Sequence, residues 1–280
     1  MIAILGASGQ LGTAFMRLLG ESATPITRNE LDLTDTPSII AWASDTRPEL
    51  MINCAAFTDV DAAEVNEAAS QLVNTVAVGA LAQAASDIGS KFVTFSTDYV
   101  FDGNKTTGYI ESDAPNPQST YGRTKLEGEQ LARSVNPDSL VIRTSWVLSG
   151  THPNFAATML RLIRKGSVRV VNDQRGRPTV VDDLAKSTLD CLYSGATGVL
   201  HLTNQGETTW FGLAQEVADL AGLDRGRVTA CSTADFPLPA ARPANSVLDS
   251  ERLSDLPIRL MPQYRDSLET VVQGLIERGY

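Results

Sequence analysis

The sequence predicts an α/β protein with a doubly wound parallel sheet of the Rossmann type and a smaller C-terminal substrate-binding lobe. Short apolar runs alternate with helical patterns in the first half of the chain, as in βαβ units. A glycine-rich turn, GASGQLG at 6–12, directly follows the first apolar run. After about residue 147 the rhythm is less regular. We therefore expect a dinucleotide-binding domain over 1–147 and mainly a substrate-binding lobe over 148–280, with some elements returning to the first domain.

Each expected element rests on a local pattern. The first apolar run, Ile2-Ala3-Ile4-Leu5, is typical of a buried parallel strand, and a helix pattern begins near Gln10. A long helix before the fourth strand should bury one face, because apolar residues recur there every four positions: Leu72, Val76, Ala80, Ala84 and Ile88. Further strands are expected at 23–27, 50–53, 92–95, 140–142, 168–171 and 199–203, and helices at 154–165, 182–193, 209–221 and 266–278.

Composition excludes several classes of protein. The 280 residues carry a net charge of −10, which argues against nucleic acid and anionic membranes as partners. No apolar run approaches the ~20 residues of a membrane helix, and residues 1–5 lack the features of a secretory signal. Cys54, Cys191 and Cys231 are widely spaced, as in reduced thiols, and His152 and His201 each stand alone. We expect a soluble cytoplasmic protein without a metal site.

The glycine-rich turn predicts a dinucleotide site. Gly6 would permit the tight turn, Gly9 would let a pyrophosphate approach the backbone, and Gly12 would allow close packing of helix on sheet. The helix N-terminus would then supply amide donors. The alternative is a plain connector between strand and helix, which the position after the first strand disfavours.

The end of the second expected strand bears on the choice of dinucleotide. An acidic residue there would bind the ribose 2′-hydroxyl of NAD, whereas this strand ends in Thr27-Arg28-Asn29. An arginine can hold a 2′-phosphate through charge-assisted hydrogen bonds. Arg28 therefore favours NADPH, with NADH left open, although it could also be a solvated surface residue.

The segment Tyr121-Gly122-Arg123-Thr124-Lys125 predicts an acid–base pair. Helical residues four apart share one face, so the Tyr121 hydroxyl and the Lys125 ammonium can point into one cleft. A free tyrosine has a pKa of about 10, and an adjacent cation favours its phenolate. The spacing alone favours a half-buried tyrosine beside a solvated lysine, and the rest of the chain favours the acid–base pair.

Two strand ends carry further candidates. Thr97 ends the fourth strand, where open α/β sheets present ligand-binding residues, and its hydroxyl could polarise a substrate carbonyl. The alternative is local capping of a turn by Ser96, Thr97 and Asp98. The small residues 53–56, Asn-Cys-Ala-Ala, end the third strand and could lie against a nicotinamide ribose or simply pack against a helix.

Together these segments resemble the dTDP-4-dehydrorhamnose reductases, a family of extended short-chain dehydrogenases/reductases. The resemblance is carried by GASGQLG (6–12), NCAAFTDVDAAE (53–64), STDYVFDG (96–103), YGRTK (121–125), RTSWV (143–147), DQRGRPT (173–179) and ARPANS (241–246). It covers nearly the whole chain, and STDYVF, RTSWV and DQxGxPT are more specific than the glycine turn or YxxxK.

The resemblance implies a role for each matching residue. Tyr121 would be the proton donor, Lys125 would bind the nicotinamide ribose and tune Tyr121, and Thr97 would complete the catalytic triad. The implied substrate residues are Thr97, Asp98, Tyr99 and Trp146. The implied cofactor residues are Gly6, Ser8, Gly9, Gln10, Leu11, Arg28, Asp32, Leu33, Ala55, Ala56 and Phe57, with Tyr121 and Lys125.

The implied reaction is NAD(P)H-dependent reduction of dTDP-4-dehydro-β-L-rhamnose to dTDP-β-L-rhamnose, the last step of dTDP-L-rhamnose biosynthesis. The substrate would be this dTDP-linked keto-deoxysugar, with its diphosphate bound by some of Arg161, Arg164, Arg175, Arg177 and Arg242. A homodimer is possible. Some relatives bind magnesium through acidic residues at a dimer contact, but here Thr13, Ala14 and Phe15 replace the glutamate, so magnesium is doubtful.

Two alternatives to this reductase stay open. The fold and motifs also resemble the NADP-binding regulatory subunit of methionine adenosyltransferase, which needs no reductase reaction. A sugar-nucleotide epimerase would use the same Tyr121–Lys125 pair with tightly held NAD. Turnover distinguishes the reductase from both alternatives, because only a reductase releases oxidised cofactor in each cycle.

Of the tryptophans, Trp146 is expected in the substrate site because it follows the fifth strand, and Trp210 is expected in the core.

Overall fold

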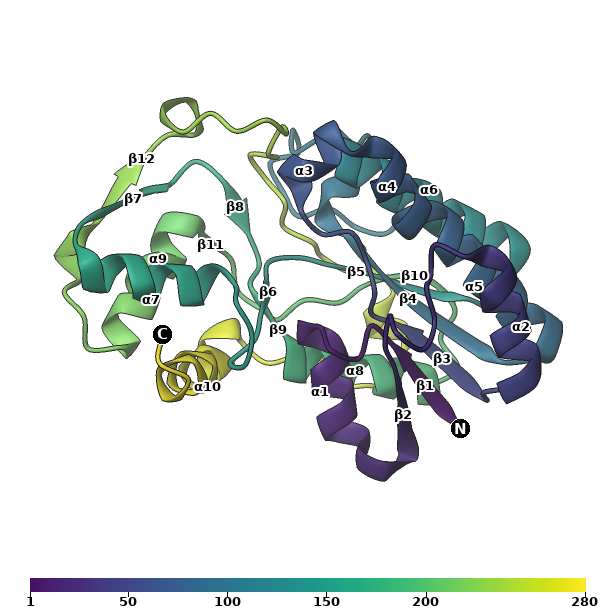
Figure 1. Cartoon of the computed structure of the whole chain (residues 1–280). Helices are drawn as coiled ribbons and strands as arrows, with labels where there is room; N and C mark the ends of the chain where they lie inside the picture. Colours follow the sequence, from purple (N-terminus) through teal and green to yellow (C-terminus); the bar gives the residue numbers. More distant parts are fainter.

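A six-stranded parallel sheet forms the centre of the structure, a computed structural model that describes all residues from Met1 to Tyr280. Its strand order is β10-β5-β4-β3-β1-β2, and every pairing is parallel (Figure 1). The strands are β1 (Ile2–Leu5), β2 (Ala23–Ile26), β3 (Leu50–Asn53), β4 (Lys91–Thr97), β5 (Leu140–Thr144) and β10 (Gly198–His201). All six were expected from sequence, and β10, from the second half of the chain, joins the sheet beside β5.

Helices cover both faces of this sheet, which confirms the doubly wound fold. One face packs against α1 (Gln10–Leu19) and α8 (Val181–Tyr193), with Ile4, Phe15 and Leu184 in the shared core. The other face packs against α2 (Thr36–Thr46), α5 (Ala77–Ile88) and α6 (Thr120–Val135), with Leu5 and Leu81 in the core there. Ile4 and Leu5 lie in different cores because successive side chains of a strand point to opposite faces.

A second group of elements lies beside the sheet, on the left in Figure 1. The helices α7 (Phe155–Lys165), α9 (Trp210–Leu220) and α10 (Tyr264–Glu277) surround their own apolar core, which includes Leu160, Leu213 and Tyr264. The parallel pair β7 (Val168–Val171) and β12 (Val228–Cys231) borders them. Two short ladders are β6 (Val147–Leu148) with β9 (Thr179–Val180), and β8 (Arg175–Gly176) with β11 (Thr208–Thr209).

The long helical stretch before β4 differs from its prediction. It is divided into α3 (Val60–Val65), α4 (Glu67–Gln71), a π-helical turn over Leu72–Val76, and α5. Val76, expected on the buried face, is 40% exposed, whereas Asn74 and Thr75 are buried. Strict four-residue spacing drifts around a helix of 3.6 residues per turn, and the wider π turn shifts the buried face further. The predicted apolar face is therefore wrong at Val76.

The π turn fixes α6 against its neighbours. Thr75 donates a hydrogen bond from Oγ1 to the Thr124 carbonyl at 2.8 Å, and the Asn74 amide donates to Thr124 Oγ1 at 3.3 Å. A Cβ atom on Gly128 would lie 2.0 Å from the Asn74 carbonyl oxygen, so only glycine allows this approach. The helix that carries Tyr121 and Lys125 is thereby held in place from within the fold.

No helix of the structure is both long enough and apolar enough to span a membrane.

The strand order reverses between β1 and β3, because the chain runs from β1 outward to β2 and then returns to the other side of β1. Open α/β sheets bind ligands outside the carboxyl ends of the strands at such a switch point.

Candidate active site

A cavity of about 920 Å³ opens at the switch point, beyond the carboxyl ends of β1, β3, β4 and β5. This volume is at the upper end of the range for small-molecule sites. With one exception, Asp32, all the expected cofactor and substrate residues line it: Gly6, Ser8, Gly9, Gln10, Leu11, Arg28, Leu33, Ala55, Ala56, Phe57, Thr97, Asp98, Tyr99, Tyr121, Lys125 and Trp146.

The glycine-rich turn forms one end of the cavity. Gly6 has a φ of 71°, and a Cβ atom there would lie 2.8 Å from the Ala55 nitrogen. A Cβ on Gly12 would lie 2.3 Å from the Gly6 carbonyl oxygen, so α1 packs directly on the turn. No side chain caps the N-terminus of α1 at Gly9. The first amides of α1 are therefore available to an anion in the cavity.

Arg28 and Asp32 both follow β2, but only Arg28 lines the cavity. Arg28 is exposed and lines the cavity. The carboxylate of Asp32 accepts hydrogen bonds from the Thr34 nitrogen at 2.9 Å and the Thr34 hydroxyl at 2.8 Å. These bonds lower the pKa of Asp32 and hold its side chain in a local turn. The structure thus brings Arg28, but not Asp32, to the lining of the cavity.

Tyr121 and Lys125 lie in the first turns of α6, beside the end of β4. The Ser119 side chain caps the helix by accepting from the Gly122 nitrogen at 3.1 Å. The Tyr121 ring meets the Tyr99 ring edge to face, with centroids 5.6 Å apart. The Lys125 ammonium, on a residue that is 5% exposed, donates to the Phe95 carbonyl at 2.6 Å. Both side chains therefore reach the same cavity, as their spacing predicts.

Burial controls the ionisation of this pair. It raises the pKa of Tyr121 to about 12, although the Thr97 side chain opposes the shift. Burial also lowers the pKa of Lys125 to about 8, against the opposing charge of Glu129. The sequence predicts that Lys125 favours the phenolate; here desolvation is the stronger effect, because both groups are buried. At neutral pH Tyr121 is a phenol and can donate its proton.

Thr97 and Asp98 end β4 and begin a 3₁₀ turn (Asp98–Val100). The Thr97 hydroxyl donates to Oδ1 of Asp98 at 2.9 Å and accepts from the Tyr99 nitrogen at 3.2 Å. The capping that the sequence leaves open for this segment is thus present in the structure. Burial raises the pKa of Asp98 to about 6.

Trp146 and Trp210 form a stacked pair in the cavity wall. Their ring centroids are 3.6 Å apart and their planes differ by 7°. Trp146 has a φ of 47°, which is rare for a large side chain, and its indole nitrogen donates to Ser246 Oγ at 3.1 Å. A Cβ on Gly176 would lie 2.3 Å from the Trp146 ring, so only glycine at this position leaves room for the indole. Trp210, expected in the core, packs against the apolar core of α7, α9 and α10 and also lines the cavity.

A buried ion pair behind Lys125 was not predicted. Arg143 of β5 binds Glu129 of α6 through its Nη2 at 2.7 Å and its Nε at 2.9 Å, with both side chains at most 5% exposed. Glu129 lies one turn after Lys125 and raises its pKa. The sequence gives no signal for this pair, because the two residues come from separate elements.

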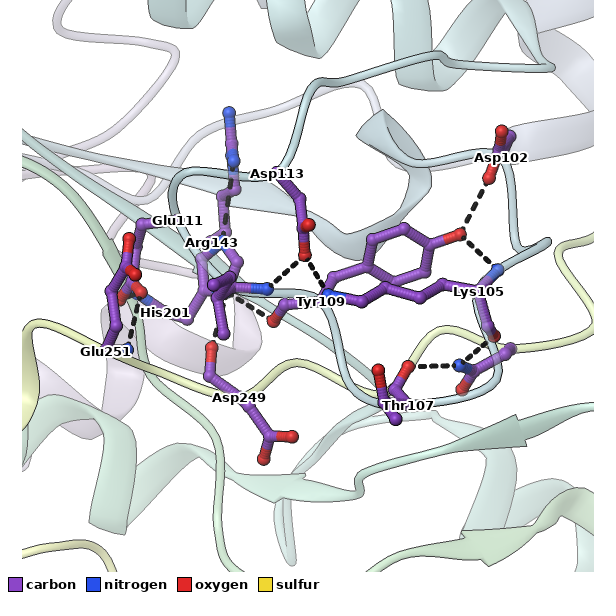
Figure 2. A network of polar contacts seen from close by, with 12 residues as sticks. Asp102, Lys105, Thr107, Tyr109, Glu111, Asp113, Arg143, His201, Asp249 and Glu251 are labelled. Atoms are coloured by element: carbon purple, nitrogen blue, oxygen red, sulfur yellow. Dashed lines mark hydrogen bonds and ion pairs between the residues drawn. The ribbon is translucent and has the colours of Figure 1, made fainter.

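The same arginine joins a larger polar network, shown in Figure 2. Arg143 Nη1 lies 3.4 Å from Nε2 of His201, whose Nδ1 lies 2.8 Å from the Asp249 carbonyl oxygen. Nδ1 of His201 therefore carries the hydrogen. Nearby, the Tyr109 hydroxyl donates to Asp102 and accepts from the Lys105 nitrogen. The network ties β5 and β10 to the loops that run beside the site.

None of the five arginines considered for a substrate diphosphate lines the cavity. Arg242 binds Asp61 at 2.7 Å, Arg175 binds Glu207 at 2.8 Å and Arg177 binds Asp249. Arg161 and Arg164 are exposed on α7. Arg242 is distinguished from the others because its charge acts on the Tyr99 hydroxyl at the edge of the site.

His152 lines the cavity as well. Its Nε2 lies 3.0 Å from the Ser8 carbonyl oxygen, and its Nδ1 lies 2.8 Å from Thr151 Oγ1. Asn154, the N-cap of α7, donates to Gln10 Oε1 at 3.4 Å. The segment before α7 thus contacts the glycine-rich turn, which no local sequence pattern indicates.

Comparison with known proteins places this site in a family. The family model described as RmlD substrate binding domain matches residues 1–276. A dTDP-4-dehydrorhamnose reductase of Burkholderia thailandensis is 37% identical, with 99% of each chain covered. A probable dTDP-4,6-dihydroxy-2-methyloxan-3-one 4-ketoreductase of Streptomyces antibioticus is 40% identical, covering 98% of this chain and 95% of its own.

Among solved structures, the dTDP-4-dehydrorhamnose reductase of Bacillus anthracis in complex with NADP superposes with a TM-score of 0.93. It is 32% identical, covering 99% of this chain and 98% of its own. The sequence match spans nearly every element of both halves, and the overall fold is shared. The chain therefore belongs to the RmlD substrate binding domain family, together with these dTDP-4-dehydrorhamnose reductases.

Proposed function

We propose that this protein reduces the 4-keto group of dTDP-4-dehydro-β-L-rhamnose with NAD(P)H and so forms dTDP-β-L-rhamnose. Membership of the family and the activity of its named relatives support this proposal. The observation that carries it is the position of Tyr121 and Lys125. Both residues line one cavity with the glycine-rich turn, at the carboxyl end of β4. A proton donor and a dinucleotide site within one cavity are what a ketone reductase requires.

The cofactor would lie along the switch point. Its diphosphate fits the uncapped N-terminus of α1 at Gly9, and its adenosine 2′-phosphate would meet Arg28. The NADP bound by the Bacillus anthracis relative supports NADPH as the working cofactor, and NADH is the second choice. When bound, the reduced nicotinamide supplies the hydride for carbon 4 of the sugar.

The chain's own residues handle the proton. Tyr121 is a phenol at neutral pH, so it can give its proton to the oxygen that gains negative charge during reduction. The ammonium of Lys125, with a pKa of about 8, stabilises the resulting phenolate and also binds the nicotinamide ribose. Trp146 and Tyr99 line the same cavity, with the Tyr99 ring against Tyr121, and both would bind the deoxysugar. The protein otherwise aligns the reactants.

A related substrate is the second candidate. The Streptomyces relative is named as a ketoreductase for a different dTDP-linked keto sugar, and it is 40% identical to this chain. The same site chemistry would serve either sugar, because both reactions reduce a keto group. The cytoplasmic location, a homodimer and the division into residues 1–147 and 148–280 belong to this proposal as well.

Turnover with purified protein tests the proposal. The chain is mixed with NADPH and dTDP-4-dehydro-β-L-rhamnose, the nicotinamide absorbance is followed, and the product is identified by NMR. Equimolar loss of NADPH and formation of dTDP-β-L-rhamnose support the reductase. NADPH binding without turnover of any keto sugar would contradict it and favour a regulatory subunit. Conversion to an epimer without net loss of NADPH would contradict it in favour of an epimerase.

A further inference from the structure

The hydrogen bonds of Thr97 limit what its hydroxyl can do. A threonine hydroxyl has one hydrogen to donate, and here it goes to Oδ1 of Asp98 at 2.9 Å. The same oxygen accepts from the Tyr99 nitrogen at 3.2 Å. While its hydrogen lies on Asp98, Thr97 cannot donate to a substrate carbonyl or to the oxygen of Tyr121, although its hydroxyl lies close enough to Tyr121 to influence the pKa of that phenol. The donor role that the sequence predicts for Thr97 therefore requires that the bond to Asp98 be reversed.

Asp98 is placed so that this reversal can occur. Its side chain is 2% exposed, and Oδ2 has no hydrogen-bond partner. The nearby hydroxyl of Ser246 donates to the Arg175 carbonyl at 3.2 Å and accepts from the Trp146 indole. The Thr97 hydroxyl donates to Oδ1 of Asp98, and the Ser246 hydroxyl also lies close enough to lower the pKa of Asp98. A buried carboxylate with so few donors favours its neutral acid form.

The charged and titratable groups around Asp98 do not counter its preference for the neutral acid form. Tyr99, in the same 3₁₀ turn, and Tyr121, on α6, each have a pKa that the charge of Asp98 raises. Arg242 faces Tyr99 and is already paired with Asp61. Burial is the main cause that raises the pKa of Asp98, to about 6. The acid and carboxylate forms are therefore both accessible close to neutral pH.

We propose that Asp98 is a positioning residue whose protonation sets the direction of the hydrogen bond to Thr97 and so controls whether Thr97 can donate to Tyr121. In the carboxylate form, Thr97 donates to Asp98. In the acid form, Asp98 donates to Thr97, whose hydrogen is then free for the Tyr121 oxygen. This hydrogen bond would hold the Tyr121 proton toward the substrate and stabilise the phenolate after transfer. The inference rests on the proposed reductase function.

The rival explanation is that Asp98 only shapes the turn. Thr97 caps the 3₁₀ turn through the Tyr99 nitrogen whichever way its hydrogen points. A purely structural Asp98 would influence folding and binding, but it would not add an ionisation to the rate of catalysis. A pH profile therefore separates the two explanations.

Asp98→Asn is the variant that tests the proposal. An asparagine amide always has hydrogens to donate to Thr97, and it does not ionise between pH 5 and 9. In the wild type, kcat/KM for the keto sugar should fall about a hundredfold from pH 6 to pH 8, about fifty-fold as Asp98 loses its proton and about twofold as Lys125 loses its own. In Asp98→Asn kcat/KM should fall only about twofold between these two pH values, because only the loss of the Lys125 proton remains. The separate fall due to Lys125 should remain above pH 8 in both proteins.

Two controls keep the outcome clear. Thr97→Val removes the hydroxyl through which Asp98 acts, so adding Asp98→Asn to it should change the pH profile much less, leaving only the effect of the Asp98 charge on Tyr121. Circular dichroism and NADPH affinity verify that each variant is folded. An equal fall with pH in the wild type and in Asp98→Asn would overturn the proposal, as would a pH effect of Asp98→Asn that is just as large without the Thr97 hydroxyl.

An activity-independent measurement separates this inference from the proposed function. The ¹³C chemical shift of the Asp98 carboxyl group, in cofactor-free protein, should titrate near pH 6. In Thr97→Val the midpoint should rise, because the carboxylate loses the hydrogen bond that Thr97 donates to its Oδ1. An Asp98 that titrates near pH 4, like an exposed carboxyl group, would overturn the inference. A chain that reduces no keto sugar would overturn the proposed function and leave this titration unchanged.

Discussion

Replacing Trp210 by alanine tests the aromatic wall of the cavity. The change removes the ring that stacks on Trp146 with centroids 3.6 Å apart. It also removes the contact of Trp210 with Phe155, whose centroid lies 4.5 Å away. We expect the apparent KM for the keto sugar to rise and the affinity for NADPH to stay nearly constant. The ring contacts and the hydrogen bond of the two indoles involve each other, Phe155 and Ser246 rather than the glycine-rich turn, so NADPH binding should change little.

The size of the effect follows from the stack. An aromatic pair contributes about 0.5–1.5 kcal/mol beyond its buried area, which corresponds to roughly two- to thirteen-fold in affinity. Trp146→Ala alone should also raise KM, since it removes the indole that is fixed by Ser246 and Gly176. In a double-mutant cycle on kcat/KM, Trp146 and Trp210 should therefore couple by about 0.5–1.5 kcal/mol.

Steady-state kinetics on the wild type, Trp210→Ala, Trp146→Ala and the double variant measure this coupling. Trp42→Phe is the control, because Trp42 lies in α2 and does not line the cavity. A tryptophan in the core would instead cost about 3–5 kcal/mol of folding free energy on truncation. A large loss of thermal stability in Trp210→Ala, with unchanged kinetics at lower temperature, would refute a substrate role for the pair.

Two further predictions concern the cofactor and the buried ion pair. Arg28→Ala should weaken NADPH binding by about 1.5–3 kcal/mol, roughly ten- to a hundredfold, and leave the affinity for NADH nearly unchanged. Fluorescence titration measures both affinities. Equal losses for the two cofactors would show that Arg28 is only a surface residue. Glu129→Gln should lower the free energy of unfolding in urea by about 3–5 kcal/mol, because it leaves the Arg143 guanidinium buried without its counter-charge. A change below about 1 kcal/mol would contradict the importance of this pair.

The sheet and the glycine-rich turn could be predicted because their signals are local. Each strand is a short apolar run, and the turn is defined by Gly6, Gly9 and Gly12 at fixed spacing. The resemblance to a family then brought distant segments into one site, which periodicity alone could not do. These segments meet at the switch point, where the carboxyl ends of parallel strands lie together.

What could not be predicted depends on contacts between distant residues. The exposure of Val76 follows from a π turn that packs on α6, and no period in the sequence announces it. Trp210 reaches the cavity because α9 begins beside Trp146. The rise in the pKa of Tyr121 depends on desolvation, which only the packed structure reveals. The direction of the bond from Thr97 to Asp98 likewise requires coordinates.

The rate of keto-sugar reduction by Tyr121→Phe tests the central claim most directly. The substitution keeps the ring and its edge-to-face contact with Tyr99 and removes only the hydroxyl. If Tyr121 delivers the proton, the chemical step should slow by about 10²–10⁴-fold, while NADPH binding stays nearly intact because the glycine turn and Lys125 remain. Single-turnover oxidation of NADPH measures this step. A phenylalanine variant that reduces dTDP-4-dehydro-β-L-rhamnose at close to the wild-type rate would contradict the account.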